Sequence, residues 1–207
     1  MPKSTFNNLG KEKREQIMEA ALDEFSSNSY AEASINRICK ACQIAKGSFY
    51  QYFEDKLDLY TYLLTEANEV KLQYFSETLN KLDQLGFIEQ IKALYISGVE
   101  FALQNPKLSN LAREFAKEKD SEVRQAILKG NEQKAQVFYE VLIEKAKANG
   151  TVKITTNTAA LAMLIHALNN AVYDYMIENF GAMDYVSGKT ALYGFVDELL
   201  SILKNGI

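Results

Sequence analysis

Residues 34–53 read SINRICKACQIAKGSFYQYF, and this stretch decides the fold. Ser34 is typical of a helix N-cap, because its hydroxyl can accept a hydrogen bond from a free amide one turn on. The apolar stripe of a short helix follows and consists of Ile35, Ile38 and Cys39. Gln43 and Ile44 mark a tight turn, and a second short helix is predicted over residues 45–51.

A supporting helix is predicted just before this pair, over residues 11–27. Its apolar residues recur mainly three, four and eight positions apart, which indicates one buried face. Two short helices joined by a tight turn and preceded by a supporting helix form a helix-turn-helix unit, whose second short helix lies in the major groove of DNA. The sequence therefore predicts a DNA reader.

Charge is distributed unevenly along the chain. The net charge of the whole chain is −4, but residues 1–56 carry eight basic and eight acidic side chains. Residues 33–53 contain no Asp or Glu, whereas they contain Arg37, Lys40 and Lys46. A stretch without acids in an acidic chain predicts a local electropositive surface, as nucleic-acid binding requires.

The predicted reading helix is rich in hydrogen-bond donors, namely Lys46, Ser48, Tyr50 and Gln51. Gly47 lets the backbone approach a phosphate closely. Arg37, on the preceding helix, can reach a phosphate or hold guanine with both arms of its guanidinium. Ser34 and Lys56 lie at helix N-termini, where free amides and the helix dipole attract phosphate.

The same residues resemble the reader of the TetR family of transcriptional regulators. In that family a helix begins at Ser or Thr, continues through an Ile-Ala core, turns at a Gly-Val-Ser step, and then reads Lys-Gly-(Ser/Thr)-(Leu/Phe)-Tyr-x-Tyr-Phe. Residues 46–53 read KGSFYQYF, which is the most specific part of the match, and EDKLDL at residues 54–59 is similar to the family's start of helix four. The resemblance covers about residues 11–64.

The resemblance implies a role for each matching residue. It implies phosphate contacts from Ser34, Ser48, Tyr50 and Lys56, and base or groove contacts from Arg37, Lys46, Gly47, Gln51 and Tyr52. Two residues depart from the family pattern. Gln43 replaces the usual Gly at a turn that favours a positive φ, and Ala45 replaces the usual Ser cap, which costs the reading helix about 0.5–2 kcal/mol.

The remainder of the chain is predicted to be helical throughout. The ranges are 55–82, 86–103, 106–117, 121–148, 155–179 and 187–204. Two prolines and ten glycines provide few turns, which favours long helices over strands. The predicted fold is all-α with about nine helices, a three-helix helix-turn-helix domain followed by a C-terminal helical bundle. The predicted domains are residues 1–56 and 57–207, with helix four straddling the boundary from about residue 55.

The resemblance assigns ligand binding and dimerisation to residues 57–207. It implies a ligand pocket within helices four to seven and a homodimer through the last two long helices. Two apolar stripes agree with a dimer, the first Leu161, Leu164, Leu168, Ala171, Val172 and Tyr175, and the second Leu192, Phe195, Val196, Leu199, Leu200 and Leu203. Such stripes can form an isologous four-helix interface.

Ligand sites are mostly apolar with a few polar anchors. Candidate pocket residues for a small hydrophobic or amphipathic ligand are Tyr62, Tyr95, Phe101, Phe115, Tyr139, His166 and Asn170. Most aromatic residues at helical spacing are simply core. The polar stripe of His166, Asn169, Asn170, Tyr173 and Asp174 has two interpretations, a pocket lining or hydrogen bonds across the dimer interface, and we favour the second.

Cys39 and Cys42 have a spacing that is also found in redox pairs and zinc sites. Zinc needs four ligands, and His166 is the single histidine of the chain. A redox pair would need a strand-to-helix setting, which the helical context lacks. Buried packing is therefore the favoured interpretation, and neither a metal site nor a cofactor is predicted.

Several classes of protein are disfavoured. The chain has no paired Glu-x-x-His steps, P-loop, Gly-rich dinucleotide turn or Ser-His-Asp set, so an enzyme is not expected. No apolar stretch approaches the ~20 residues that span a bilayer, and no secretory leader is evident. We expect a cytoplasmic protein without a membrane partner.

These observations predict a sequence-specific DNA-binding regulator. The leading hypothesis is a repressor that a small-molecule ligand releases from a near-palindromic operator of double-stranded DNA. The alternative is a DNA-binding regulator controlled by a protein partner. A large apolar cavity in the helical body would favour the ligand, and a solid core would favour the partner.

Overall fold

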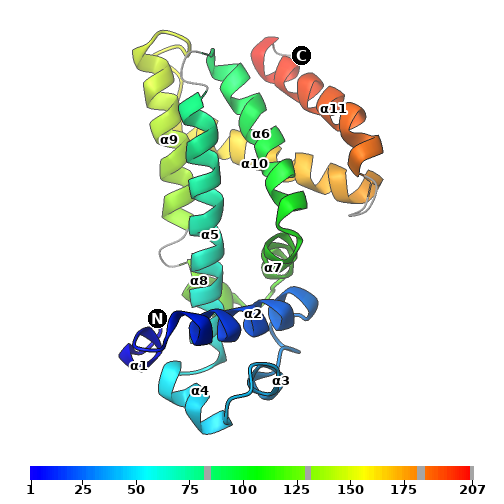
Figure 1. The fold of residues 1–207 in the computed structure, drawn as a ribbon. Helices are drawn as coiled ribbons and strands as arrows, with labels where there is room; N and C mark the ends of the chain where they lie inside the picture. The colour runs from blue at the N-terminus through cyan, green and yellow to red at the C-terminus, as the bar shows by residue number, and fades with distance from the viewer. Residues whose placement is uncertain (82–84, 129–131, 181–184, 206–207) are drawn as a thin grey trace. The chain divides into compact units, whose positions relative to one another are not determined.

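The computed structural model describes residues 1–81, 85–128, 132–180 and 185–205 (Figure 1). This described part contains eleven helices and no strand, so the predicted all-α fold is confirmed. The helices are α1 (Ser4–Asn7), α2 (Lys11–Ser27), α3 (Ile35–Ala41), α4 (Lys46–Tyr52), α5 (Lys56–Lys81), α6 (Phe87–Gln104), α7 (Pro106–Ala116), α8 (Ser121–Leu128), α9 (Glu132–Ala148), α10 (Thr158–Phe180) and α11 (Tyr185–Asn205).

Two differences from the sequence-based prediction explain the larger number of helices. The four-residue α1 has too few residues to show a helical period, and it was missed. The single helix predicted over 121–148 is described as α8 and α9, while its residues 129–131 lie outside the described part. Asn157 caps α10, because its Oδ1 accepts a hydrogen bond from the Ala160 amide at 2.9 Å.

The chain divides into two compact units. The first unit comprises residues 1–70 and 105–131, and the second comprises residues 71–104 and 132–207. Helices α7 and α8 and most of α5 therefore pack with α1–α4 in the first unit. The functional boundary predicted at residue 56 stays a prediction.

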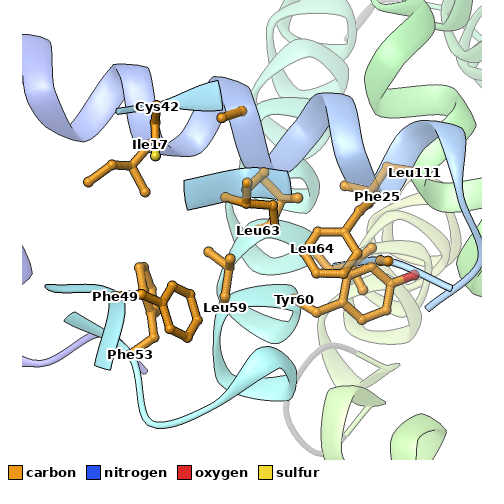
Figure 2. Packing of buried hydrophobic residues seen from close by; sticks show 14 of the residues in the cluster. Ile17, Phe25, Cys42, Phe49, Phe53, Leu59, Tyr60, Leu63, Leu64 and Leu111 are labelled. Atoms are coloured by element: carbon orange, nitrogen blue, oxygen red, sulfur yellow. The ribbon is translucent and has the colours of Figure 1, made fainter. Parts of the chain in front are cut away.

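One buried cluster holds the first unit together (Figure 2). Helix α2 contributes Ile17 and Phe25, which are fully buried, and α5 contributes Leu59 and Tyr60. The rings of Phe25 and Tyr60 lie 4.6 Å apart. Each such side chain contributes roughly 1.5–3 kcal/mol through burial, so this core fixes the platform from which α3 and α4 extend.

The second unit has its own buried cluster, built by α5, α6, α9, α10 and α11. Its fully buried members include Ile91, Ile143 and Ile165. The Tyr95 hydroxyl donates a hydrogen bond to the Ile165 carbonyl at 2.7 Å, which ties α6 to α10.

The two predicted dimer stripes are wrong in part. The structure buries Val172, Leu192, Val196 and Leu200 against the core of their own chain, where they cannot also face a second subunit. An outward face of α10 instead carries Met163, Leu164, Ala167, Asn170, Ala171 and Asp174, all of them exposed. Periodicity located the apolar residues but could not say which of them the chain covers itself.

Candidate nucleic-acid interface

Helix α3 ends in a left-handed turn that leads into α4. The amide of Ile44 donates to the Cys39 carbonyl at 3.0 Å, and the amide of Gln43 donates to the Lys40 carbonyl at 3.4 Å. This pair of bonds is the common end of a helix whose next residue is left-handed. Gln43 has φ 53°, so the predicted positive-φ turn is confirmed, with Gln in the place that favours Gly.

Helix α4 is held by two aromatic residues and exposes the remainder of its surface. Phe49 and Phe53 are fully buried, and their rings lie 5.7 Å apart (Figure 2). The exposed positions are Lys46, Gly47, Tyr50 and Gln51, and Ser48 and Tyr52 are half-buried. As predicted, Ala45 gives the helix no side-chain cap. The exposed face therefore consists of a cation, hydroxyls and an amide without a carboxylate.

Gly47 is not needed by the fold. It lies inside α4, where a Cβ would meet no atom within 4 Å. Glycine within a helix costs about 1 kcal/mol relative to alanine. A glycine that destabilises the helix and fills no steric need inside the protein favours a role toward a partner outside it.

The N-terminal segment closes the C-terminal end of α4. The Lys3 amide donates to the Tyr52 carbonyl at 2.8 Å, the Lys3 Nζ donates to the Tyr50 carbonyl at 3.0 Å, and the Thr5 hydroxyl donates to the Gln51 carbonyl. These carbonyls have no partner within the helix itself. Phe6 is buried, with its ring 4.9 Å from that of Phe53. This support was not predicted, because its one signal in the sequence is an isolated Phe in a polar segment.

Arg37 is occupied by the protein. Its Nε donates to both carboxylate oxygens of Glu24, at 2.9 and 3.0 Å, and its Nη2 donates to the Glu32 carbonyl at 2.7 Å. Glu24 also accepts a hydrogen bond from the Ser34 amide at 2.8 Å. Desolvation raises the pKa of Glu24, but the bonds from Arg37 and Ser34 outweigh it, and the net pKa is lowered. Arg37 thus joins α3 to α2 through Nε and Nη2, while its predicted DNA contact stays a prediction.

Lys56 is occupied in a similar way. Its Nζ donates to the carbonyls of Tyr30 at 2.6 Å, Ala31 at 3.3 Å and Ala33 at 3.0 Å, and it lies 4.5 Å from the centre of the Tyr30 ring. An ammonium has three donors, and in this structure all three point to these carbonyls, so the predicted phosphate contact stays a prediction. Lys56 fixes the loop between α2 and α3.

The acids that follow α4 are compensated locally. Glu54 pairs with Lys3 at 2.8 Å. Asp58 pairs with the N-terminal amine and accepts a hydrogen bond from the Glu54 amide at 3.0 Å. Of the three acids that follow α4, Glu54 and Asp58 are therefore paired with cations, and the exposed Asp55 accepts a hydrogen bond from the Asp58 amide at 2.8 Å.

Comparisons with known proteins agree with this geometry. The family model described as "Bacterial regulatory proteins, tetR family" matches residues 17–63, from within α2 into α5. A TetR family transcriptional regulator from Chloroflexus aurantiacus superimposes with a TM-score of 0.69 at 27% identity, covering 100% of this chain and 98% of that one. The chain belongs to the TetR family.

Two further relatives of this TetR-family chain extend the comparison. The HTH-type transcriptional regulator UidR of Escherichia coli is 24% identical over 170 residues, covering 77% of this chain and 79% of UidR. The transcriptional regulator FadR of Bacillus subtilis, solved in complex with stearoyl-CoA, has the same fold, with a TM-score of 0.71 at 19% identity over 93% of this chain and 98% of FadR. The chain is a DNA-binding transcriptional regulator of this family, which is not a family of enzymes.

The candidate pocket residues of this TetR-family chain do not form one group. Tyr62 and Phe115 pack against the core of the first unit. The other five lie in the second unit, where Tyr95 and Phe101 are buried and Tyr95 is hydrogen-bonded to Ile165. Tyr139, His166 and Asn170 do come together, because the His166 ring lies 6.3 Å from that of Tyr139 and its Nε2 lies 3.5 Å from the Asn170 amide nitrogen.

Cys39 and Cys42 belong to the buried cluster of the first unit. Burial raises the pKa of both thiols, which disfavours the thiolate that redox or zinc chemistry needs. Among the described residues no group of potential metal ligands comes together, and none of the described helices is long and apolar enough to cross a bilayer.

Proposed function

We propose that this TetR-family chain is a homodimeric repressor, and that a small molecule bound in its second unit releases it from a near-palindromic operator. The observation that carries the proposal is α4, an acid-free helix whose exposed glycine has no steric purpose in the fold. In a dimer two such helices would enter successive major grooves, about 34–36 Å apart.

Within this proposal the exposed face of α4 reads the operator. Lys46, Gly47 and Gln51 contact bases or the groove together with Tyr52, and Ser34, Ser48 and Tyr50 contact phosphates. Lys56 positions the loop before α3, because its ammonium donates to three backbone carbonyls. Arg37 joins α3 to α2 through Nε and Nη2, and the Nη1 donors of its exposed guanidinium are proposed to contact a phosphate or a base edge.

Dimerisation through α10 and α11 is supported by exposed apolar side chains. Met163 is 69% exposed, Leu164 45% and Ile202 55%. Exposed apolar surface of this kind on long helices suits an isologous interface. Under this proposal residues 1–56 bind DNA, and residues 57–207 bind the ligand and the second subunit.

Ligand gating is supported by the course of α5, one helix that contributes residues to both units. A ligand that shifts this helix would change the spacing of the two reading helices, and a coupling of ~1–3 kcal/mol is typical of such transmission. FadR of Bacillus subtilis, which has this fold, binds stearoyl-CoA. A ligand in the second unit is therefore favoured over control by a protein partner.

Selection of DNA from random duplexes with the purified protein tests the proposal. We expect a near-palindromic site, bound with a steep salt slope of about −0.9 per neutralised phosphate. Gln51→Ala should alter the selected sequence, while Ser48→Ala should weaken binding to all sequences alike. Enrichment of a single half-site by a monomeric protein would overturn the dimeric mechanism, and absence of enrichment would overturn the assignment of α4 as the reader.

A further inference from the structure

Most basic side chains of residues 1–56 are engaged within the protein. This part of the chain carries eight of them. Six have a hydrogen-bond or ion-pair partner in the first unit, namely Lys3, Lys11, Lys13, Arg14, Arg37 and Lys56. Among the described residues, the ammonium groups of Lys40 and Lys46 have no such partner. Lys46 belongs to the reading helix α4, so Lys40 on α3 is the charge that remains to be explained.

Helix α3 is fastened to α2 near both of its ends. In the first turn of α3, the Arg37 Nε donates to the Glu24 carboxylate at 2.9 Å. At the other end, the Lys13 Nζ donates to the carbonyl of Cys42, the C-cap of α3, at 2.8 Å. The direction in which the outward face of α3 points is therefore fixed by the fold of the first unit.

The outward face of α3 carries Asn36 and Lys40. Both are exposed, and they lie on one face of the helix because they are four positions apart. Ile38 and Cys39, in contrast, belong to the buried cluster. Neither Asn36 nor Lys40 has a side-chain partner among the described residues. Burial raises the pKa of the Cys39 thiol and the charge of Lys46 opposes that rise, so Lys46 lies near the end of α3 that carries Lys40. The outward face of α3 therefore adjoins the acid-free helix α4.

We propose that Lys40 contacts the phosphate backbone of the operator, with the Asn36 amide as a neutral donor to the same backbone. In a helix-turn-helix unit the first helix crosses the backbone while the second lies in the major groove. A phosphate gives the Lys40 ammonium the charge-assisted bond that the protein does not supply. Such a contact fixes the register of the reader and carries no sequence information. This inference rests on the proposed function, because it takes α4 as the helix that enters the groove.

A purely structural role for Lys40 makes a different prediction. Lys40 lies in the last turn of α3, where a cation stabilises the negative end of the helix dipole. A lysine with that role alone would affect the unfolding temperature and leave the salt dependence of DNA binding unchanged. A lysine that contacts a phosphate contributes to the salt dependence, because the contact releases counterions from the DNA. The salt dependence therefore distinguishes the two roles.

The test measures the affinity of the full-length protein for the selected operator and for a random duplex at several salt concentrations. In Lys40→Met the slope of log affinity against log salt should become shallower by about 0.9 for each bound subunit. The affinity for both duplexes should fall by the same factor, roughly tenfold at about 0.1 M salt. Lys40→Arg should keep the wild-type slope. Asn36→Ala should weaken binding to both duplexes alike and keep the slope, because it removes an uncharged donor.

Lys119→Met is the matched control, because Lys119 is also an exposed lysine of the first unit but lies in the turn between α7 and α8. It changes the net charge by the same amount and should leave the slope unchanged. Equal slopes for the wild-type protein and Lys40→Met, or an equal change in Lys119→Met, would overturn the backbone contact. A changed ratio of operator affinity to random-duplex affinity in Lys40→Met would also overturn it, because Lys40 would then read a base.

Binding to the random duplex distinguishes this contact from the proposed function. If no operator is enriched but Lys40→Met makes the salt slope on the random duplex shallower, the Lys40 contact stands and the reading role of α4 fails. If an operator is enriched and Lys40→Met binds it with the wild-type slope, the reading role of α4 stands and the Lys40 contact is wrong.

Discussion

Lys56 in the first unit and Lys71 in the second are both half-buried residues of α5, and desolvation lowers the pKa of both. The Lys56 ammonium donates to three backbone carbonyls. The Lys71 ammonium has no polar partner among the residues that the structure describes. The comparison teaches that the same residue type on one helix can be fully hydrogen-bonded in one unit and lack a polar partner among the described residues in the other.

The same contrast extends beyond the two lysines. In the first unit Arg37, Ser34 and Glu24 satisfy one another, and the N-terminal segment occupies the last carbonyls of α4. The second unit leaves apolar side chains exposed on α10, with Met163 the most exposed of them. The first unit thus satisfies its polar groups internally, whereas the second unit leaves apolar side chains uncovered. Four substitutions test this contrast, in order of decreasing expected effect.

Phe6→Ala should have the largest effect, because it removes the side chain that anchors the N-terminal segment beneath α4. Phe6 is 1% exposed and contacts the rings of Tyr52, Phe53 and Tyr62. Loss of a buried Phe costs about 3 kcal/mol, measured as the free energy of unfolding in urea. Operator binding should weaken as well, since the α4 carbonyls lose their donors. Phe6→Leu should keep most of both properties, and unchanged operator affinity in Phe6→Ala would show that the segment does not support the reader.

Glu24→Gln should have the next largest effect, about 2 kcal/mol, because it weakens charge-assisted bonds to Arg37 and to the Ser34 amide. The folded-state pKa of Glu24 lies below its usual 4.5. Its contribution to stability is therefore complete above pH 4.5 and is lost as the pH falls through the folded-state value. Thermal unfolding between pH 7 and pH 3 should show wild type and variant converging in acid. Glu19→Gln, on the exposed side of the same helix, is the control. An equal loss of stability in Glu19→Gln would mean that Glu24→Gln acts through the change in net charge and not through the bonds to Arg37 and Ser34.

The roles of Arg37 and Lys56 show where the sequence stops being informative. The caps, the turn and the buried stripe of residues 34–53 depend on neighbours within a few positions, and they were predicted. Arg37 meets Glu24 across 13 residues, and Lys56 meets the Tyr30 carbonyl across 26. Whether a basic side chain in a reader is free or occupied depends on such distant partners, which spacing alone does not reveal.

The second unit was harder to predict for a different reason. Nearly every helix there has an apolar face, and the pattern does not distinguish a face that covers its own core from one that meets a second subunit. Val196 and Leu164 were therefore placed in the same interface, although the structure buries the first and exposes the second. Lys71 was missed because an isolated lysine in a helix is usually solvated, and the lack of a polar partner for it among the described residues is visible only in three dimensions.

Lys71→Met should stabilise the protein by about 1 kcal/mol, because it replaces an unpaired charge with an apolar side chain of similar length. The folded-state pKa of Lys71 lies below 10.5, so the wild-type penalty is complete below that folded-state value and disappears above pH 10.5. Chemical unfolding between pH 7 and pH 10.5 should show the two proteins converging as the pH rises. A less stable Lys71→Met at pH 7 would mean that the ammonium serves the fold, and the contrast with Lys56 would then be lost.

Gly47→Ala should have the smallest effect on stability and is the most specific test of the reader. A helical glycine with open space around its Cβ position gains about 0.5–1 kcal/mol on substitution by alanine. Operator affinity should fall at least tenfold, because the added methyl group separates the backbone of α4 from DNA. Gly194→Ala in α11, also helical with no atom within 4 Å of its Cβ position, should give the same gain in stability without loss of affinity. If Gly47→Ala binds the operator as tightly as wild type, the glycine is incidental, and the contact surface lies elsewhere on the reader.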